Sequence, residues 1–271
     1  MTDRQPQILD IEKVIISKAG KKAKFIPRFV INWFKNYMHL DYNNAYLKEG
    51  YVGVEFCEIC LDYLGVTLEV DGLDNLPKDG RKYTFVSNHP LGAIDGVTLG
   101  AVIGREYDGK IKYLMNDLLM NLKGMAPLGI PINKLGGQAR NLPRLINDVY
   151  ASDNQMLVFP AGLCSRKIDG KIQDIEWGKS FIKKSRETGR DIVPIHFEGE
   201  NSKRFYRIAT WQKKLGFKFN FAMMTLPSEM VRSAGRTYKV TIGKPVPVSS
   251  LDRSRSVSEW AQEIRKSVYE L

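Results

Sequence analysis

Short apolar runs alternate with amphipathic stretches along most of the chain. Four stretches have the spacing of helices: Gly96–Ile103, Asp117–Lys123, Ala139–Tyr150 and Trp177–Thr188. Between them lie runs rich in β-branched and aromatic residues, which have the length of buried strands. These runs are Val66–Val70, Tyr83–Ser87, Ile111–Leu114, Met156–Phe159, Ile192–Phe197 and Tyr238–Ile242. The alternation predicts an α/β fold with a mostly parallel central sheet flanked by helices on both faces.

Helical patterns also occupy both ends of the chain. Residues 256–259 read Ser-Val-Ser-Glu, the spacing of a capping box, and an amphipathic pattern continues from there to Leu271. Near the N-terminus, apolar residues of Lys21–Leu40 recur every three or four positions, and Tyr46–Tyr63 is helical and apolar. We therefore expect an N-terminal segment of amphipathic helices over residues 1–64 and a main domain over residues 65–271.

The composition is that of a globular protein with a strong excess of positive charge. Hydrophobic residues make up 43% of the 271 residues, and 41 Lys and Arg against 30 Asp and Glu leave a net charge of +11. This charge favours an anionic partner, which could be nucleic acid, an acidic small molecule or a membrane surface. Three cysteines cannot form an even disulfide framework, which favours a reducing compartment. We expect neither a secretory signal at Met1–Pro6 nor a membrane-spanning helix.

Two segments combine basic and aromatic residues and contain no acidic residue, Lys21–Leu40 and Asn201–Ser228. The first could pack its apolar stripe on the domain or lie in a membrane interface. The second segment favours the membrane, because it adds six aromatic and six basic residues of the same kind. The chain contains no nucleic-acid-binding motif. We therefore predict peripheral attachment to an anionic membrane surface and no nucleic-acid partner.

The strongest chemical signal follows the strand pattern Tyr83–Ser87. There, Asn88 and His89 begin a loop containing proline and glycine, and Asp95 opens the next helical pattern. Loops at the carboxyl ends of strands are where α/β folds bind their ligands. A neutral imidazole can accept a proton near pH 7, and a carboxylate can orient it and stabilise its charged form. The alternative is a structural histidine bonded to an aspartate that caps the helix.

Three further blocks follow along the chain, and the first of them is weak on its own because a solvated turn arginine is the commoner outcome. Val158–Arg166 runs from an apolar strand into a turn ending in Ser165 and Arg166, and a guanidinium there suits a carboxylate or phosphate or is simply solvated. Leu128–Lys134 is an apolar run that ends in a cation, and Ile192–Ile195 is an apolar element whose proline indicates a sheet edge or strand start.

The cysteines favour structural interpretations. Cys57 and Cys60 form a C-x-x-C pattern, but their helical, apolar neighbourhood favours the core over a redox or zinc site, for which further ligands are lacking. Cys164 is expected to be a small turn residue rather than a nucleophile, and no Gly-x-Ser-x-Gly elbow offers a serine nucleophile.

Together, the four blocks resemble the glycerolipid acyltransferase superfamily, of the lysophosphatidate type, over about residues 66–245. The chain departs from the usual pattern in three ways. Five residues rather than four separate His89 from Asp95, Ala161 replaces the acid of the third block, and Lys134 replaces an arginine. These features resemble the hemolysin-like branch, which includes enzymes that O-acylate lyso-aminolipids of the ornithine and glycine type. Loss of the acid favours an acceptor with a free carboxylate over a glycerol phosphate.

The resemblance implies direct acyl transfer from a thioester to a hydroxyl, with His89 as general base and Asp95 orienting it. It implies substrate-binding roles for Asn88, Asn133, Lys134, Gly162, Ser165 and Arg166. No cofactor or metal is implied, and the donor is acyl carrier protein or, alternatively, acyl-CoA. The expected location is the cytoplasmic face of the inner membrane.

Three alternatives stay open at this point. The acceptor could be lysophosphatidate instead of a lyso-aminolipid. The chain could be a non-catalytic membrane- or lipid-binding module, for which the unusual spacing from His89 to Asp95 is the best argument. A membrane-damaging activity is the third, and neither a secretion signal nor a pore-forming pattern supports it.

Overall fold

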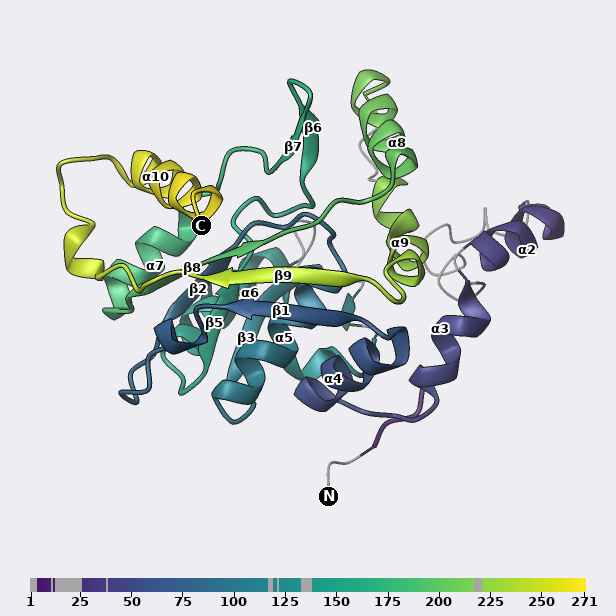
Figure 1. Cartoon of the computed structure of the whole chain (residues 1–271), viewed down its shortest axis with the longest axis horizontal. Helices are drawn as coiled ribbons and strands as arrows, with labels where there is room; N and C mark the ends of the chain where they lie inside the picture. Colours follow the sequence, from purple (N-terminus) through teal and green to yellow (C-terminus); the bar gives the residue numbers. More distant parts are fainter. Residues whose placement is uncertain are drawn as a thin grey trace.

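The computed structural model describes residues 4–10, 12, 26–37, 39–116, 119–120, 122–132, 138–216 and 221–271. Within these residues, seven strands form one sheet in the order β1-β9-β8-β2-β5-β3-β4. Neighbouring strands are parallel except for β8 and β9, which are antiparallel (Figure 1). The predicted α/β fold with a mostly parallel sheet is therefore confirmed.

The six predicted strands lie within two residues of their expected bounds, and sequence patterns missed three short ones, β4, β6 and β7. Strands β6 and β7 form a separate antiparallel hairpin. The strands are β1 (Thr67–Asp71), β2 (Thr84–Ser87), β3 (Ile111–Asn116), β4 (Gly129–Ile132), β5 (Gln155–Val158), β6 (Arg166–Ile168), β7 (Lys171–Gln173), β8 (Ile192–Phe197) and β9 (Thr237–Ile242).

The helices connect the strands and cover both faces of the sheet. They are α2 (Arg28–Tyr37), α3 (Leu40–Leu47), α4 (Gly53–Leu64), α5 (Ile94–Glu106), α6 (Gln138–Tyr150), α7 (Ser180–Thr188), α8 (Lys203–Lys214), α9 (Leu226–Arg232) and α10 (Val257–Tyr269). Short 3-10 helices are η2 (Leu73–Asn75), η4 (Ala126–Leu128), η5 (Phe221–Thr225) and η6 (Val248–Ser250). Helix α10 begins with the predicted capping box, in which Ser256 and Glu259 bond each other's backbone N–H groups.

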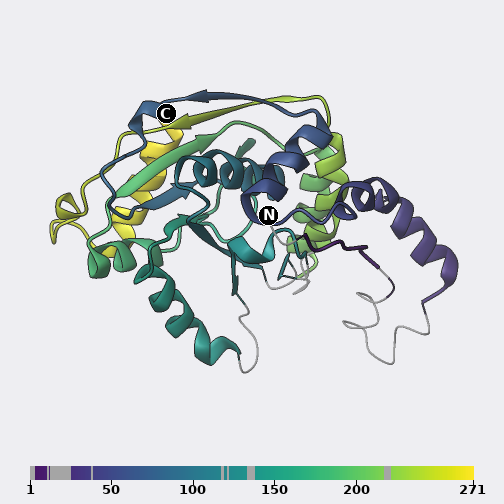
Figure 2. The ribbon, with the colours of Figure 1, turned by 90° about the horizontal axis from the view of Figure 1, so that it is seen from below.

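The core lies in two layers, one on each side of the sheet. Successive side chains of β2 belong to different layers, because side chains alternate along a strand. Phe85 packs with α4 and α5, and Val86 packs with α7 and α10. The helices on the two sides of the sheet are seen from two directions in Figures 1 and 2. Helix α4 belongs to the predicted N-terminal segment 1–64, yet its buried face is part of the first layer.

Two helix predictions differ from the structure. Tyr46–Tyr63 is interrupted between α3 and α4, where Gly50 and Gly53 take positive φ angles of 76° and 65°. The described part of Asp117–Lys123 forms only tight turns, in which the N–H of Leu122 bonds the Leu119 carbonyl at 3.0 Å.

Pro194 lies in the interior strand β8, so the expectation of a sheet edge or strand start was wrong. Strand β8 pairs with β2 on one side and β9 on the other. The Pro194 carbonyl accepts the N–H of Gly243 at 2.8 Å. The Pro194 nitrogen therefore faces the gap between the β8–β9 ladder and the isolated Ile192–Val246 bridge. A missing N–H costs little where the ladder is already interrupted.

The N-terminal region differs in part from the expected helix over Lys21–Leu40. Helix α2 occupies Arg28–Tyr37 of it, and Pro27 immediately precedes the first turn. Residues 21–25 and 38 lie outside the described residues. In the described part of the chain, no helix combines the length and the apolar composition that crossing a bilayer requires.

Candidate active site

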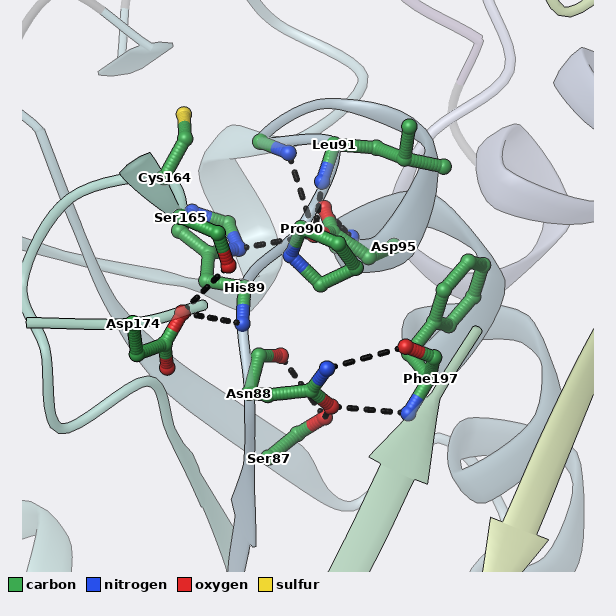
Figure 3. Close-up of polar contacts among 12 residues, drawn as sticks. Ser87, Asn88, His89, Pro90, Leu91, Asp95, Cys164, Ser165, Asp174 and Phe197 are labelled. Atoms are coloured by element: carbon green, nitrogen blue, oxygen red, sulfur yellow. Dashed lines mark hydrogen bonds and ion pairs between the residues drawn. The ribbon is translucent and has the colours of Figure 1, made fainter. Parts of the chain in front are cut away.

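Strand β2 carries His89 to the carboxyl edge of the sheet. All four residues of β2 are buried, and the strand pairs with both β5 and β8. Directly after it, the buried Asn88 amide donates to the Phe197 carbonyl at 2.9 Å and accepts the Phe197 N–H at 2.7 Å (Figure 3). These bonds extend the pairing of β2 and β8 by one step. The end of β2, and hence the backbone that carries His89, is held in place.

A tight loop returns the chain from His89 to Asp95 at the start of α5. Asp95 is fully buried, and its Oδ2 accepts the N–H groups of Leu91 at 2.9 Å and Gly92 at 3.0 Å (Figure 3). Gly92 takes a φ of 81°, and a Cβ there would lie 2.3 Å from Cys164 Sγ. Both the turn and the close packing therefore require glycine, and the loop spans the five intervening residues with the N–H groups of Leu91 and Gly92 bonded to Asp95.

The side chains of His89 and Asp95 are in contact, as the sequence predicts. His89 Nδ1 lies 3.0 Å from Asp95 Oδ2, an ion-pair contact that is not aligned as a hydrogen bond. Catalytic hydrogen bonds are often poorly aligned without substrate. The His89 ring stacks on Phe159, with ring centroids 4.1 Å apart and planes inclined by 27°. The His89 side chain stays 16% exposed, so it is not closed off from solvent.

The charged groups around His89 shift its pKa. Burial of the imidazole opposes its charged form, but the Asp95 carboxylate, helped by Asp174, outweighs this and raises the pKa of His89 above its ordinary value; Arg166 acts in the opposite direction. Burial would raise the pKa of Asp95, and His89 together with the loop N–H groups lowers it below its ordinary value. Asp95 is therefore a carboxylate near neutral pH and can stabilise an imidazolium.

The third block packs directly against His89. The Ser165 N–H donates to the His89 carbonyl at 2.7 Å, and Ser165 Oγ donates to Asp174 Oδ1 at 2.6 Å (Figure 3). Arg166 Nη1 donates to the Cys164 carbonyl at 2.7 Å, and its guanidinium lies over the Phe205 ring at 5.4 Å. The structure therefore brings Ser165 and Arg166 next to the catalytic candidates.

The remaining predicted residues lie elsewhere or have other partners. Gly162 is exposed in the turn after β5 with a φ of 68°. Asn133 and Lys134 lie outside the described residues, directly after β4. Burial raises the pKa of the Cys164 thiol to about 12, so it stays protonated and is a poor nucleophile. Cys57 and Cys60 are buried in the core, as expected.

Sequence patterns did not indicate Asp174, the acid that lies behind His89. It is 1% exposed and follows β7 in a stretch of mixed charge. Nothing in the local sequence sets it apart, because its burial depends on α10 and on the His89 loop. Within the described residues, no group of three or more His, Cys, Asp or Glu side chains is arranged to hold a metal ion.

The chain as a whole is similar to known proteins. An acyltransferase family model matches residues 13–271. A curated protein of Phocaeicola vulgatus is 51% identical over 273 residues, covering 100% of this chain and 98% of its own. One of Bacteroides thetaiotaomicron is 50% identical and covers 100% of both chains. Both relatives are named lyso-glycine lipid O-acyltransferase.

A solved structure is similar in fold. The crystal structure of the 1-acyl-sn-glycerophosphate acyltransferase PlsC from Thermotoga maritima aligns with a TM-score of 0.51 over 96% of this chain and 89% of its own. Sequence identity is 17%, so this likeness concerns the fold alone.

Proposed function

Because the chain belongs to this acyltransferase family, we propose that it moves a fatty acyl group from a thioester to the hydroxyl of a lyso-glycine lipid. The observation that carries the proposal is the His89–Asp95 pair at the carboxyl edge of the sheet. The full-length similarity to two lyso-glycine lipid O-acyltransferases supports this acceptor. The product would be a diacylated aminolipid for the membrane.

The proposed reaction is a single direct transfer. Nδ1 of His89 faces Asp95, so Nε2 is the nitrogen that takes the proton from the acceptor hydroxyl. The hydroxyl oxygen attacks the thioester carbonyl, an ester bond forms and the C–S bond breaks. His89 then gives the proton to the leaving thiolate, which departs as a free thiol. Base catalysis of this kind contributes about 10²–10⁴-fold, and positioning supplies much of the rest.

The proposed acceptor carries a free carboxylate, and Arg166 is the group we assign to it. Among the described residues, no carboxylate forms an ion pair with Arg166, whose guanidinium is half-buried beside the His89 loop. Ala161 leaves the third block without its usual acid, so no negative charge at that position repels the acceptor. We assign Lys134 and Asn133 to the same headgroup from the resemblance alone. Asn88, Ser165 and Gly162 shape the loops around it.

An acceptor assay tests this proposal. The purified full chain is given an acyl carrier protein thioester or acyl-CoA with either lyso-glycine lipid or lysophosphatidate, and ester products are measured by mass spectrometry. We expect transfer to lyso-glycine lipid at a kcat/KM at least about tenfold higher than to lysophosphatidate, and acyl carrier protein as the better donor. Transfer only to lysophosphatidate would reverse the choice of acceptor. Absence of transfer to both would favour a lipid-binding module.

We also propose that α2 and α8 attach the protein peripherally to an anionic membrane, on the cytoplasmic face. Phe29 and Trp33 of α2 are 73% and 57% exposed, and Trp211 of α8 is 70% exposed. The Arg204 guanidinium lies 4.3 Å from the Tyr37 ring centroid, so the first turn of α8 meets the C-terminal end of α2. Exposed aromatic side chains flanked by cations are typical of a helix lying in a membrane interface.

Removing two aromatic side chains of α2 tests this attachment. We expect F29S/W33S to weaken binding to phosphatidylglycerol vesicles by about tenfold or more, because each ring loses apolar contact with the acyl chains. Co-sedimentation with vesicles measures the effect. Leu73→Ser, which removes a 42% exposed apolar side chain on η2, serves as the control. Equal vesicle binding by F29S/W33S and the control contradicts a membrane role for α2.

A further inference from the structure

Asp174 and Ser165 together hold both backbone polar groups of His89. The His89 N–H donates to Asp174 Oδ1 at 3.2 Å, and the His89 carbonyl accepts the Ser165 N–H at 2.7 Å. Ser165 Oγ donates to the same Asp174 Oδ1 at 2.6 Å and closes a ring of three hydrogen bonds (Figure 3). The N–H and the carbonyl of His89 are therefore bonded to Asp174 and Ser165, which are also bonded to each other.

Asp174 is itself held from three sides. Its Oδ2 accepts the indole N–H of Trp177 at 2.9 Å, its backbone N–H donates to Tyr269 Oη at 2.8 Å, and its carbonyl accepts Arg265 Nη2 at 2.7 Å. Tyr269 and Arg265 belong to α10, so the C-terminal helix anchors the acid. A buried carboxylate with every oxygen bonded has one orientation, which suits a residue that positions another.

The charge of Asp174 also acts on the imidazole. His89 faces two carboxylates, Asp95 and Asp174, and one cation, Arg166. Burial raises the pKa of Asp174, and the hydrogen bonds from Ser165 and Trp177, with the charge of His89, oppose the rise. His196 on β8 also lies within electrostatic range of Asp174. The carboxylate form of Asp174 favours protonated His89, as Asp95 does.

We propose that Asp174 is a positioning residue for the general base: it fixes the backbone of His89 both directly and through Ser165, and it adds a second negative charge near the ring. This rests on the proposed function of His89 as base. Asp95 orients the imidazole ring by its contact with Nδ1, whereas Asp174 fixes the position of the backbone from which the side chain extends. A shift of about 1 Å in the position of that backbone is enough to lower the rate by about 10²-fold.

The test compares Asp174→Asn, Ser165→Ala and the double variant by the pH dependence of kcat/KM and by kcat, using the full chain and the preferred donor and acceptor. We expect D174N to lower kcat by about 10–100-fold. The acidic limb of the kcat/KM profile of D174N moves about 0.5–1 pH unit lower, because loss of a negative charge lowers the pKa of His89. S165A lowers kcat but leaves that limb near its wild-type position. The double variant loses no more than D174N, since the two residues act as one unit.

Asp191→Asn is the matched control. Asp191 is a mostly buried acid at the other edge of the sheet, where it accepts the Val248 N–H at 2.8 Å and pairs with Arg81 at 3.1 Å. We expect D191N to lose stability without a change in the pH profile. If D174N fails to fold, D174N/W177F is measured instead, because it removes the conflict between the new amide and the indole N–H.

Two outcomes overturn the inference: a D174N protein with wild-type kcat, or one with reduced kcat and an unmoved acidic limb, which is the result of a merely structural role. Failure of the proposed function is recognised separately: either the unmodified chain transfers no acyl group, or His89→Ala keeps its activity in the same assay. An inactive H89A together with an unshifted D174N therefore removes only the role of Asp174.

Discussion

Replacing His89 by alanine is expected to lower kcat by about 10²–10⁴-fold without unfolding the protein. The variant removes the group that takes the proton from the acceptor hydroxyl, while the backbone bonds of His89 to Asp174 and Ser165 remain available. Release of free thiol from the acyl donor measures the rate, and circular dichroism checks the fold. The chain offers a matched control in His39→Asn, an exposed histidine with a φ of 47°, a conformation that asparagine tolerates.

The same assay on the unmodified chain has an expected pH dependence. A general base works in its neutral form, so kcat/KM falls as pH drops through the pKa of free His89. Asp95 and Asp174 raise that pKa above the ordinary value, so the fall begins at a higher pH than for an isolated imidazole. An H89A protein that keeps wild-type kcat at every pH contradicts the assignment of His89 as base.

Replacing Asp95 by asparagine is expected to lower kcat by about 10³-fold or more, as loss of an orienting carboxylate does in other histidine-based sites. The amide carries no charge to stabilise the imidazolium. It also has one oxygen in place of the two that accept the N–H groups of Leu91, Gly92 and Gly96. We therefore expect a loss of stability of about 1–3 kcal/mol as well.

The pH profile separates the two effects of D95N. Without the Asp95 charge, burial lowers the pKa of His89, so the acidic limb of kcat/KM moves to lower pH. Thermal unfolding measures the stability, and Asp74→Asn, an exposed acid on η2, is the control for both measurements. Residual activity above about a tenth of wild type in D95N would mean that Asp95 only caps α5.

Local sequence was sufficient for most of the fold and for singling out His89 and Asp95 as candidates, and the resemblance of the four blocks implied their roles. Strand β8 was predicted to the residue, and the capping box marked the start of α10. Both features depend on neighbours within a few positions, where strand composition and cap chemistry act. The loop from His89 to Asp95 is likewise short, so its proline and glycine indicate that the chain turns back.

Other features were decided only by the tertiary structure. Asn88 bonds Phe197 across 109 positions, and Asp174 bonds His89 across 85, so neither partner is visible in a local pattern. Pro194 was expected at a sheet edge or a strand start, because no local pattern shows that the ladder beside it is interrupted next to Gly243, which directly follows β9. The sequence by itself thus determined the order of elements through short-range periodicity, and it indicated the candidate acid–base pair through turn chemistry and the four-block resemblance. Only the packed sheet decided which polar groups hold that pair in place, because burial and long-range hydrogen bonding exist only once distant segments meet.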